Sequence, residues 1–157
     1  MITLNLRFDE GIEPIDLTSA KAVVSQLDKQ APVKIPDAAV VNARIVNEQT
    51  VRDLNRRFSG KDEATDVLSF NYAENHPQAA EGELGDIVIS YQHIVRQARD
   101  AGTNEATELA LLLLHGILHI LGVDHQNPKQ RKKLDKIQAS VMEAAGLTYR
   151  DFGWQDN

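Results

Sequence analysis

The stretch that decides the fold is HGILHILGVDH, which spans residues 115–125. It continues an apolar run that begins at Leu109, and its first half contains no turn-forming residue except Gly116. A continuous apolar run of this length predicts a helix buried in the middle of the core. In such a helix His115 and His119 lie one turn apart on the same face, because they are separated by four positions.

A third histidine follows beyond the expected end of this helix. Gly122 is typical of a helix end, because glycine adopts the left-handed conformation without a Cβ clash, and His125 comes three residues later. The turn can therefore bring His125 back to His115 and His119. Three neutral imidazoles around one point, with a fourth position open, are the ligands of a catalytic zinc ion. The spacing predicts one Zn²⁺ bound by these histidines; the alternative is three buried, hydrogen-bonded side chains.

The same spacing, H-x-x-x-H-x-x-G-x-x-H, occurs in the metzincin peptidases. Those enzymes have a glutamate directly after the first histidine, where it serves as the general base for the attacking water. Here that position is Gly116. The sequence therefore disfavours a peptidase, although another zinc hydrolase stays open.

The composition is that of a single globular domain over residues 1–157, with 42% hydrophobic and 25% charged residues. The chain has no cysteine, so a metal ion would be bound by histidines and carboxylates. The first residues lack the basic segment and apolar core of a signal peptide. No apolar run approaches the roughly 20 residues of a membrane helix. We expect a cytoplasmic protein without a membrane partner.

The net charge of −6 argues against a broad, non-specific grip on nucleic acid, so RNA contacts would need local basic clusters. Two such clusters are present, with a solvated helix face as the alternative interpretation of each. They consist of Arg56, Arg57 and Lys61, and of Lys129, Arg131, Lys132 and Lys133.

Hydrophobic periodicity and capping residues predict four strands and five helices, and hence an α+β or mixed α/β domain. The expected strands span residues 2–8, 38–46, 66–72 and 84–90. The expected helices span residues 18–30, 47–59, 91–101, 103–121 and 128–145, with Asn47, Thr103 and Asn127 as caps of the second, fourth and fifth.

The histidine stretch resembles the signature H-G-x-L-H-L-x-G-Y-D-H of the YbeY family, bacterial factors of ribosomal RNA maturation that are metal-dependent endoribonucleases. It departs from this signature mildly, at Ile120 and Val123. Further matching blocks are LN at 54–55, GKD at 60–62, TDVLSF at 65–70 and GDI at 85–87.

The resemblance implies an α+β domain with a mixed four-stranded sheet, about five surrounding helices and a zincin-like metal helix. It also implies a zinc-dependent, single-strand-specific endoribonuclease that acts in 16S rRNA 3′-end maturation and ribosome quality control. The expected partners are ribosomal RNA and the ribosome or its small-subunit proteins, and no DNA is expected. The open alternative is a ribosome-associated RNA-binding factor whose zinc is structural, with Asp124 or His76 as a fourth ligand.

One departure concerns catalysis. The family usually has an arginine at the place of Ser59 and a proline at that of Ala64. A guanidinium stabilises the negative charge that builds up on a phosphate during cleavage. If the helix persists to Ser59, Arg56 lies one turn back on the same face, whereas Arg57 points roughly 200° away. The sequence thus predicts Arg56 as the substitute catalytic cation, with a surface role as the alternative.

Four other polar residues have simpler interpretations. His76 precedes a proline in a loop, and His93 has no partner at ligand spacing. Asp66 and Asp86 each begin an expected strand, where a cap or turn role stands beside that of orienting a histidine.

Overall fold

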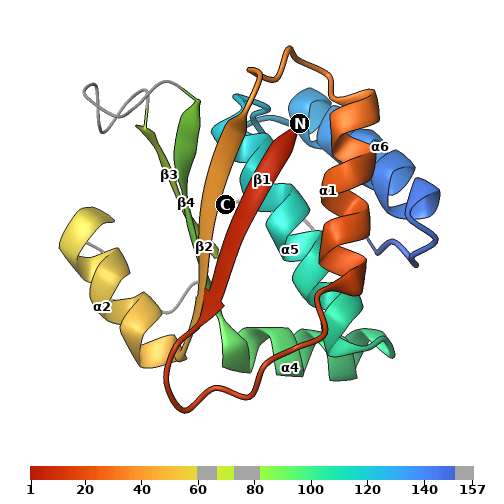
Figure 1. The fold of residues 1–157 in the computed structure, drawn as a ribbon. Helices are drawn as coiled ribbons and strands as arrows, with labels where there is room; N and C mark the ends of the chain where they lie inside the picture. Colours follow the sequence, from red (N-terminus) through yellow and green to blue (C-terminus); the bar gives the residue numbers. More distant parts are fainter. Residues whose placement is uncertain (60–66, 73–81, 151–157) are drawn as a thin grey trace.

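The computed structural model describes residues 1–59, 67–72 and 82–150. They form a single α+β domain with a four-stranded mixed sheet and five helices (Figure 1). The elements in chain order are β1 (Ile2–Phe8), α1 (Thr18–Gln30), β2 (Ala39–Val46), α2 (Glu48–Ser59), β3 (Val67–Asn71), β4 (Glu83–Ser90), α4 (Tyr91–Ala101), α5 (Glu105–Ile120) and α6 (Pro128–Ala144). The sheet order is β1-β2-β4-β3, in which β1, β2 and β4 are parallel and β3 is antiparallel to β4.

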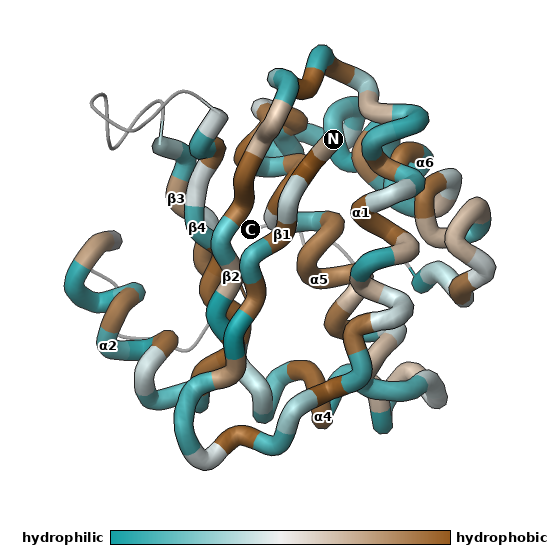
Figure 2. Tube along the Cα trace, in the orientation of Figure 1, coloured by the Kyte–Doolittle hydropathy of each residue, from teal (hydrophilic) through white to brown (hydrophobic). Residues whose placement is uncertain are grey.

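One face of the sheet carries the main core. Hydrophilic and hydrophobic residues alternate along β1, as Figure 2 shows. Because successive side chains of a strand point to opposite faces, the hydrophobic residues gather on one face of the sheet. The hydrophobic set of the strands packs against α1 and α5, and includes Val41, Ile45, Ile87 and Ile89. Helix α5 is apolar around most of its circumference and is accordingly buried in this core.

The second face of the sheet is covered only in part. Helix α2 packs there through Val51, which joins Val46 and Val88 in a small buried cluster. Phe70 of β3 packs against the same cluster. Helices α2 and α5 therefore lie on opposite faces of the sheet, as Figure 1 shows.

The close packing of α5 on β4 depends on Gly116. A Cβ atom at this position would lie 2.9 Å from Cδ1 and 3.2 Å from Cγ2 of Ile87, which is fully buried. Cβ atoms in real proteins do not approach other atoms so closely, so a side chain at position 116 would force Ile87 or α5 to move. Gly116 thus has a packing role that the sequence pattern alone does not indicate.

Most helix ends were predicted within one residue, and one cap was wrong. Asn104, not Thr103, caps α5, because its Oδ1 accepts a hydrogen bond from the backbone N of Thr107 at 2.8 Å. The caps of α2 and α6 are confirmed, with Oδ1 of Asn47 accepting from Thr50 N at 2.8 Å and Oδ1 of Asn127 from Gln130 N at 2.9 Å.

The end of α5 has the geometry expected from its glycine. Gly122 adopts a φ of 93°, which is the left-handed region that favours glycine. Its N donates to the carbonyl of His119 at 3.0 Å, and Val123 N donates to that of Leu118 at 2.9 Å. These bonds satisfy carbonyls of the last turn and direct the chain back along the helix end. No helix in the described residues is both long and apolar enough to cross a membrane.

Candidate active site

The structure brings the three predicted histidines together at the C-terminal end of α5. The ring centroids of His115 and His125 are 5.3 Å apart, and those of His119 and His125 are 5.8 Å apart. His119 is exposed, whereas the other two are half-buried, so the cluster opens to solvent on one side. The last turn of a helix carries partial negative charge, which favours a cation at this place.

The loop that delivers His125 is fixed from two sides. The backbone N of His125 donates to Oδ1 of Asp124 at 2.8 Å. On α6, Nε of Arg131 donates to the carbonyl oxygen of His125 at 3.2 Å. The sequence assigns Arg131 to a basic cluster for RNA, but the structure shows that its guanidinium supports the third histidine.

His115 is held by a polar network that sequence reasoning missed. Its Nδ1 lies 2.9 Å from Oε1 of Gln138 on α6, and Gln138 is completely buried. Nε2 of Gln138 donates to the hydroxyl of Tyr149 at 3.1 Å, and that hydroxyl donates to Oδ1 of Asp135 at 2.9 Å. A signal was present in the sequence, because Gln138 interrupts the otherwise apolar buried stripe formed by Leu134, Val141 and Met142.

Strand β3 holds the same end of α5 from the sheet side. Nδ2 of Asn71 donates to the carbonyl oxygen of Ile120 at 2.9 Å. This bond satisfies a carbonyl that a helix end leaves without an intrahelical donor. The helical part of the site is therefore anchored to both the sheet and α6.

The donor set fits zinc in its chemistry, although the ligand arrangement is not formed as the side chains stand. Imidazoles that share an ion at about 2.1 Å have ring centres roughly 5 Å apart, close to the observed spacings. However, no group of three or more His, Asp or Glu side chains in residues 1–59, 67–72 and 82–150 is arranged to hold a metal ion. The zincin-like metal helix therefore remains a prediction.

Arg56 is not placed with the histidines. It lies on α2, on the second face of the sheet, and its Nη2 pairs with Oδ1 of Asp53 at 3.1 Å. The side chain is 56% exposed. The side chain of Ser59 and the connector that follows it lie outside the described residues. The catalytic role of Arg56 thus stays a prediction.

Of the four other polar candidates, two lie outside the described residues and two make other contacts. His76 and Asp66 lie outside the described residues. Asp86 is on the second face of the sheet, where it accepts a hydrogen bond from the hydroxyl of Tyr72 at 2.5 Å. Burial, and then this carboxylate, raise the pKa of Tyr72 above its ordinary value. His93 belongs to α4, where its backbone N donates to Oγ of Ser90, the cap of that helix.

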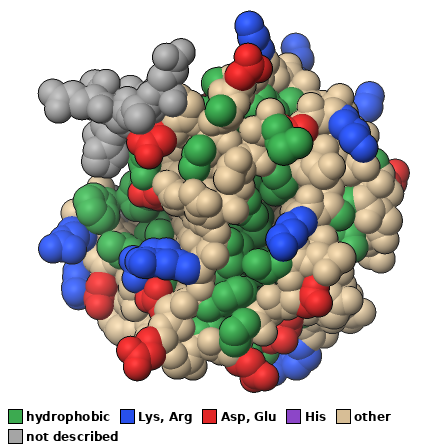
Figure 3. All heavy atoms as spheres, in the orientation of Figure 1, with side chains coloured by type: hydrophobic (Ala, Val, Ile, Leu, Met, Phe, Trp, Pro, Cys, Tyr) green, Lys and Arg blue, Asp and Glu red, His purple; other side chains and the backbone are tan. Residues whose placement is uncertain are grey.

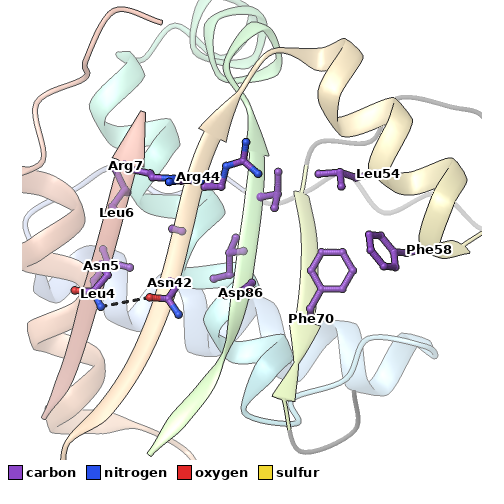
Figure 4. Close-up of a pocket in the computed structure, with 13 residues that line it drawn as sticks. Leu4, Asn5, Leu6, Arg7, Asn42, Arg44, Leu54, Phe58, Phe70 and Asp86 are labelled. Carbon is purple, nitrogen blue, oxygen red and sulfur yellow. Dashed lines mark hydrogen bonds between the residues drawn. The ribbon is translucent and has the colours of Figure 1, made fainter. Parts of the chain in front are cut away.

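A cleft of about 940 Å³ occupies the uncovered part of the second face. Figure 4 shows side chains from all four strands and from α2 around it. Asn5 and Asn42 are joined across β1 and β2 by a hydrogen bond of 3.3 Å, and Phe58 meets Phe70 edge to face at 5.4 Å. Figure 3 shows hydrophobic, basic and acidic side chains on this face of the molecule, and no histidine is seen on it. The described residues that line the cleft include no histidine, so the cleft and the histidine cluster are separate features.

Comparison with known proteins places the chain in a family. The family model described as Endoribonuclease YbeY matches residues 8–146. A protein of Brevibacillus brevis named Endoribonuclease YbeY is 38% identical, over 88% of this chain and 94% of its own length. A protein of Chloroflexus aurantiacus with the same name is 36% identical, over 92% of this chain and 96% of its own length.

The fold has a counterpart among solved structures. The solution structure of a Thermotoga maritima protein is 25% identical to this chain and superposes with a TM-score of 0.56. The match covers 99% of this chain and 100% of the other. Together with the family match over residues 8–146, these similarities show that the chain belongs to the YbeY endoribonuclease family.

Proposed function

We propose that this protein is a zinc-dependent, single-strand-specific endoribonuclease that acts in the cytoplasm in 16S rRNA 3′-end maturation and ribosome quality control. The observation that carries the proposal is the cluster of His115, His119 and His125 at the end of α5, in a chain of the YbeY family. Its relatives bear the name of endoribonucleases. Ribosomal RNA and small-subunit proteins are the partners that this role implies.

His115, His119 and His125 would hold the ion. Bound there, zinc would polarise a phosphoryl oxygen and lower the pKa of a water molecule. The protein's own contribution is to fix the three imidazoles: α5 sets two of them on one face, and Arg131 holds the carbonyl of the third residue. Gly116 offers no carboxylate beside them, in contrast to the metallopeptidases. The exposure of His119 favours a site that a substrate can reach.

Basic residues stand beside this cluster. Lys129, Lys132 and Lys133 are exposed in the first turns of α6, which begins three residues after His125. Cations at this place can contact the phosphates of an RNA strand that enters the histidine cluster, because phosphate neutralisation is the main source of nucleic-acid affinity. The net charge of −6 disfavours RNA contacts away from such local basic clusters.

The test is metal analysis combined with RNA cleavage by the full chain. We expect about one zinc per chain and cleavage of single-stranded RNA that stops with a chelator and resumes when zinc is added back. His119→Ala should lose both zinc and cleavage, whereas His93→Ala, which lies on α4, should keep both. Full zinc content without RNA cleavage would favour the alternative of an RNA-binding factor with structural zinc. Equal zinc content in His119→Ala would contradict the site itself.

A further inference from the structure

We propose that Asp135, Tyr149 and Gln138 form a directed hydrogen-bond chain that fixes the tautomer of His115, so that its neutral imidazole carries the proton on Nδ1 and the lone pair on Nε2. The three residues come from α6 and from the segment after it. They are positioning residues, since only His115 is expected to contact a metal ion. The proposal concerns the metal-free protein first.

The direction of the chain follows from its far end. The carboxylate of Asp135 only accepts hydrogen bonds when ionised, so the hydroxyl proton of Tyr149 points to it over 2.9 Å. That hydroxyl has one proton, and its oxygen can therefore only accept from Gln138. The amide NH₂ group of Gln138 faces Tyr149, at 3.1 Å, for this reason.

The orientation of the amide then determines the histidine. With its NH₂ group on Tyr149, Gln138 presents Oε1 to His115, and 2.9 Å separate this oxygen from Nδ1. An amide oxygen only accepts, so Nδ1 must donate and must carry the proton. In the neutral ring the second nitrogen, Nε2, is then left with its lone pair.

The burial of Gln138 favours one direction of this hydrogen-bond chain over the other. Gln138 is 0% exposed, so solvent does not compete for its amide. Reversal of the amide would set two acceptor oxygens against each other at Tyr149 and two donors against each other at His115, or leave a buried polar group without its partner, at a cost of about 1–3 kcal/mol. Hydrogen bonds from water to the amide therefore do not stabilise the other tautomer, in which Nε2 of His115 carries the proton.

The consequence for zinc rests on the function proposed above, but the tautomer does not. A metal ion binds the unprotonated nitrogen, and partners that hold the other ring nitrogen typically change metal affinity by about 10–100-fold. Fixing the proton on Nδ1 would keep Nε2 of His115 ready as a ligand. The RNA need not be present for this effect.

The experiment is a long-range ¹H–¹⁵N NMR spectrum of the imidazole rings in the metal-free full chain, at about pH 8.5, some two units above the ordinary imidazole pKa. The His115 signals are identified by their loss in His115→Ala. We expect the pattern of a ring protonated on Nδ1. In Asp135→Ala the hydroxyl of Tyr149 is free to donate to Gln138, the amide can turn, and the proton should shift toward Nε2.

A second substitution distinguishes the direction of the hydrogen-bond chain from a merely structural effect of Asp135→Ala. The carboxylate introduced by Gln138→Glu accepts through both oxygens, so Asp135→Ala combined with Gln138→Glu should return the proton to Nδ1. Zinc affinity, measured by competition with a chelator, should fall about 10–100-fold in Asp135→Ala and recover in the double variant. Ser140→Ala is the control on the same helix, α6. It removes a 2.7 Å hydrogen bond to Gln30 of α1 and should change neither measurement.

Two results would overturn the proposal. One is a wild-type ring of His115 protonated on Nε2. The other is an unchanged ring pattern in both Asp135→Ala and Tyr149→Phe. The second of these removes the Tyr149 hydroxyl without introducing a buried charge. If the ring pattern behaves as expected but the wild type binds no zinc, the proposed function fails and the hydrogen-bond chain stands.

Discussion

At the scale of single residues, Gly116 explains both the missing carboxylate and the close approach of two elements. It leaves no acidic side chain next to His115, and its missing Cβ lets α5 approach Ile87 of β4. A glutamate there, as in the metallopeptidases, would have to fit where the side chain of Ile87 already lies. The packing of the sheet thus gives a reason for glycine that is independent of the reaction.

We predict that Gly116→Ala destabilises the fold by about 1 kcal/mol. The overpacked methyl costs about 1–3 kcal/mol, and the gain in helix propensity offsets about 1 of this. Ile87→Val removes Cδ1, the nearest atom at 2.9 Å, and should relieve the clash in the double variant. Urea unfolding measures each free energy. Ile89→Val, on the same strand and face, is the control; the same relief from it would show that the clash is not specific to Ile87.

Ser59 stands where the YbeY family usually has an arginine, and we expect Arg56 to take its place. We predict that Arg56→Ala slows RNA turnover while zinc content stays intact, that Arg57→Ala does not, and that Ser59→Arg restores or raises the rate. The observed pair of Arg56 with Asp53 is exposed and contributes at most about 1 kcal/mol, so it does not hold the guanidinium firmly. Cleavage at saturating RNA is the measurement. An Arg56→Ala enzyme as fast as the wild type would leave Arg56 with a surface role only.

At the scale of elements, the start of α5 separates two neighbouring residues with different roles. We predict that Asn104→Ala lowers the free energy of unfolding by about 1 kcal/mol, because Oδ1 of Asn104 accepts from Thr107 N. Thr103→Ala should lower it by clearly less, since Thr103 does not provide this cap. Urea unfolding of both variants measures the difference. Equal decreases would show that the cap bond contributes nothing net.

The extent to which the elements could be predicted follows from their periodicity. Strand β1 alternates between hydrophobic and polar residues, and its bounds, Ile2–Phe8, are those expected from the pattern. The sheet order could not be read in this way, because β2 pairs with β4 across the intervening α2 and β3. Periodicity shows which face of a strand is buried, and says nothing about its neighbour.

The site was predictable to a similar depth. The spacing within one helix and one turn was enough to bring His115, His119 and His125 together. Gln138 and Tyr149 lie 23 and 34 positions after His115, and only the packing of α6 and the segment after it brings them to its ring. The support of a site thus depends on tertiary contacts that a local pattern does not contain.

At the scale of the whole molecule, the two faces of the sheet carry different chemistry. The histidine cluster belongs to the side of α5 and α6, and the cleft with Asn5 and Asn42 to the other face. A metal ion bound at the histidines would link α5 to the loop before α6. Such a link stabilises the native state only, because the unfolded chain does not gather the three ligands.

We therefore predict that zinc stabilises the whole domain. At a free zinc concentration about 100 times the dissociation constant, the free energy of unfolding should rise by about 2.7 kcal/mol. His119→Ala should show little of this increase, whereas His93→Ala should keep it. Thermal unfolding with and without zinc is the measurement. The same increase in His119→Ala would mean that the metal binds elsewhere in the chain.

An acidic molecule needs local cations to bind RNA. The net charge of −6 repels a phosphate chain at long range, so affinity must come from cations near the site. Lys132 and Lys133 are exposed on α6, whereas Arg131 also supports His125, so its substitution would mix two effects.

Lys132→Glu combined with Lys133→Glu should weaken binding of single-stranded RNA. The log–log salt slope should flatten by about 0.7 for each phosphate that the protein no longer neutralises. Lys21→Glu, on the exposed side of α1, changes charge in the same sense and should have a smaller effect. Affinity measured over a series of salt concentrations separates the two positions. If the α6 pair and Lys21→Glu weaken binding equally per charge, net charge governs RNA binding, and α6 is an ordinary solvated face.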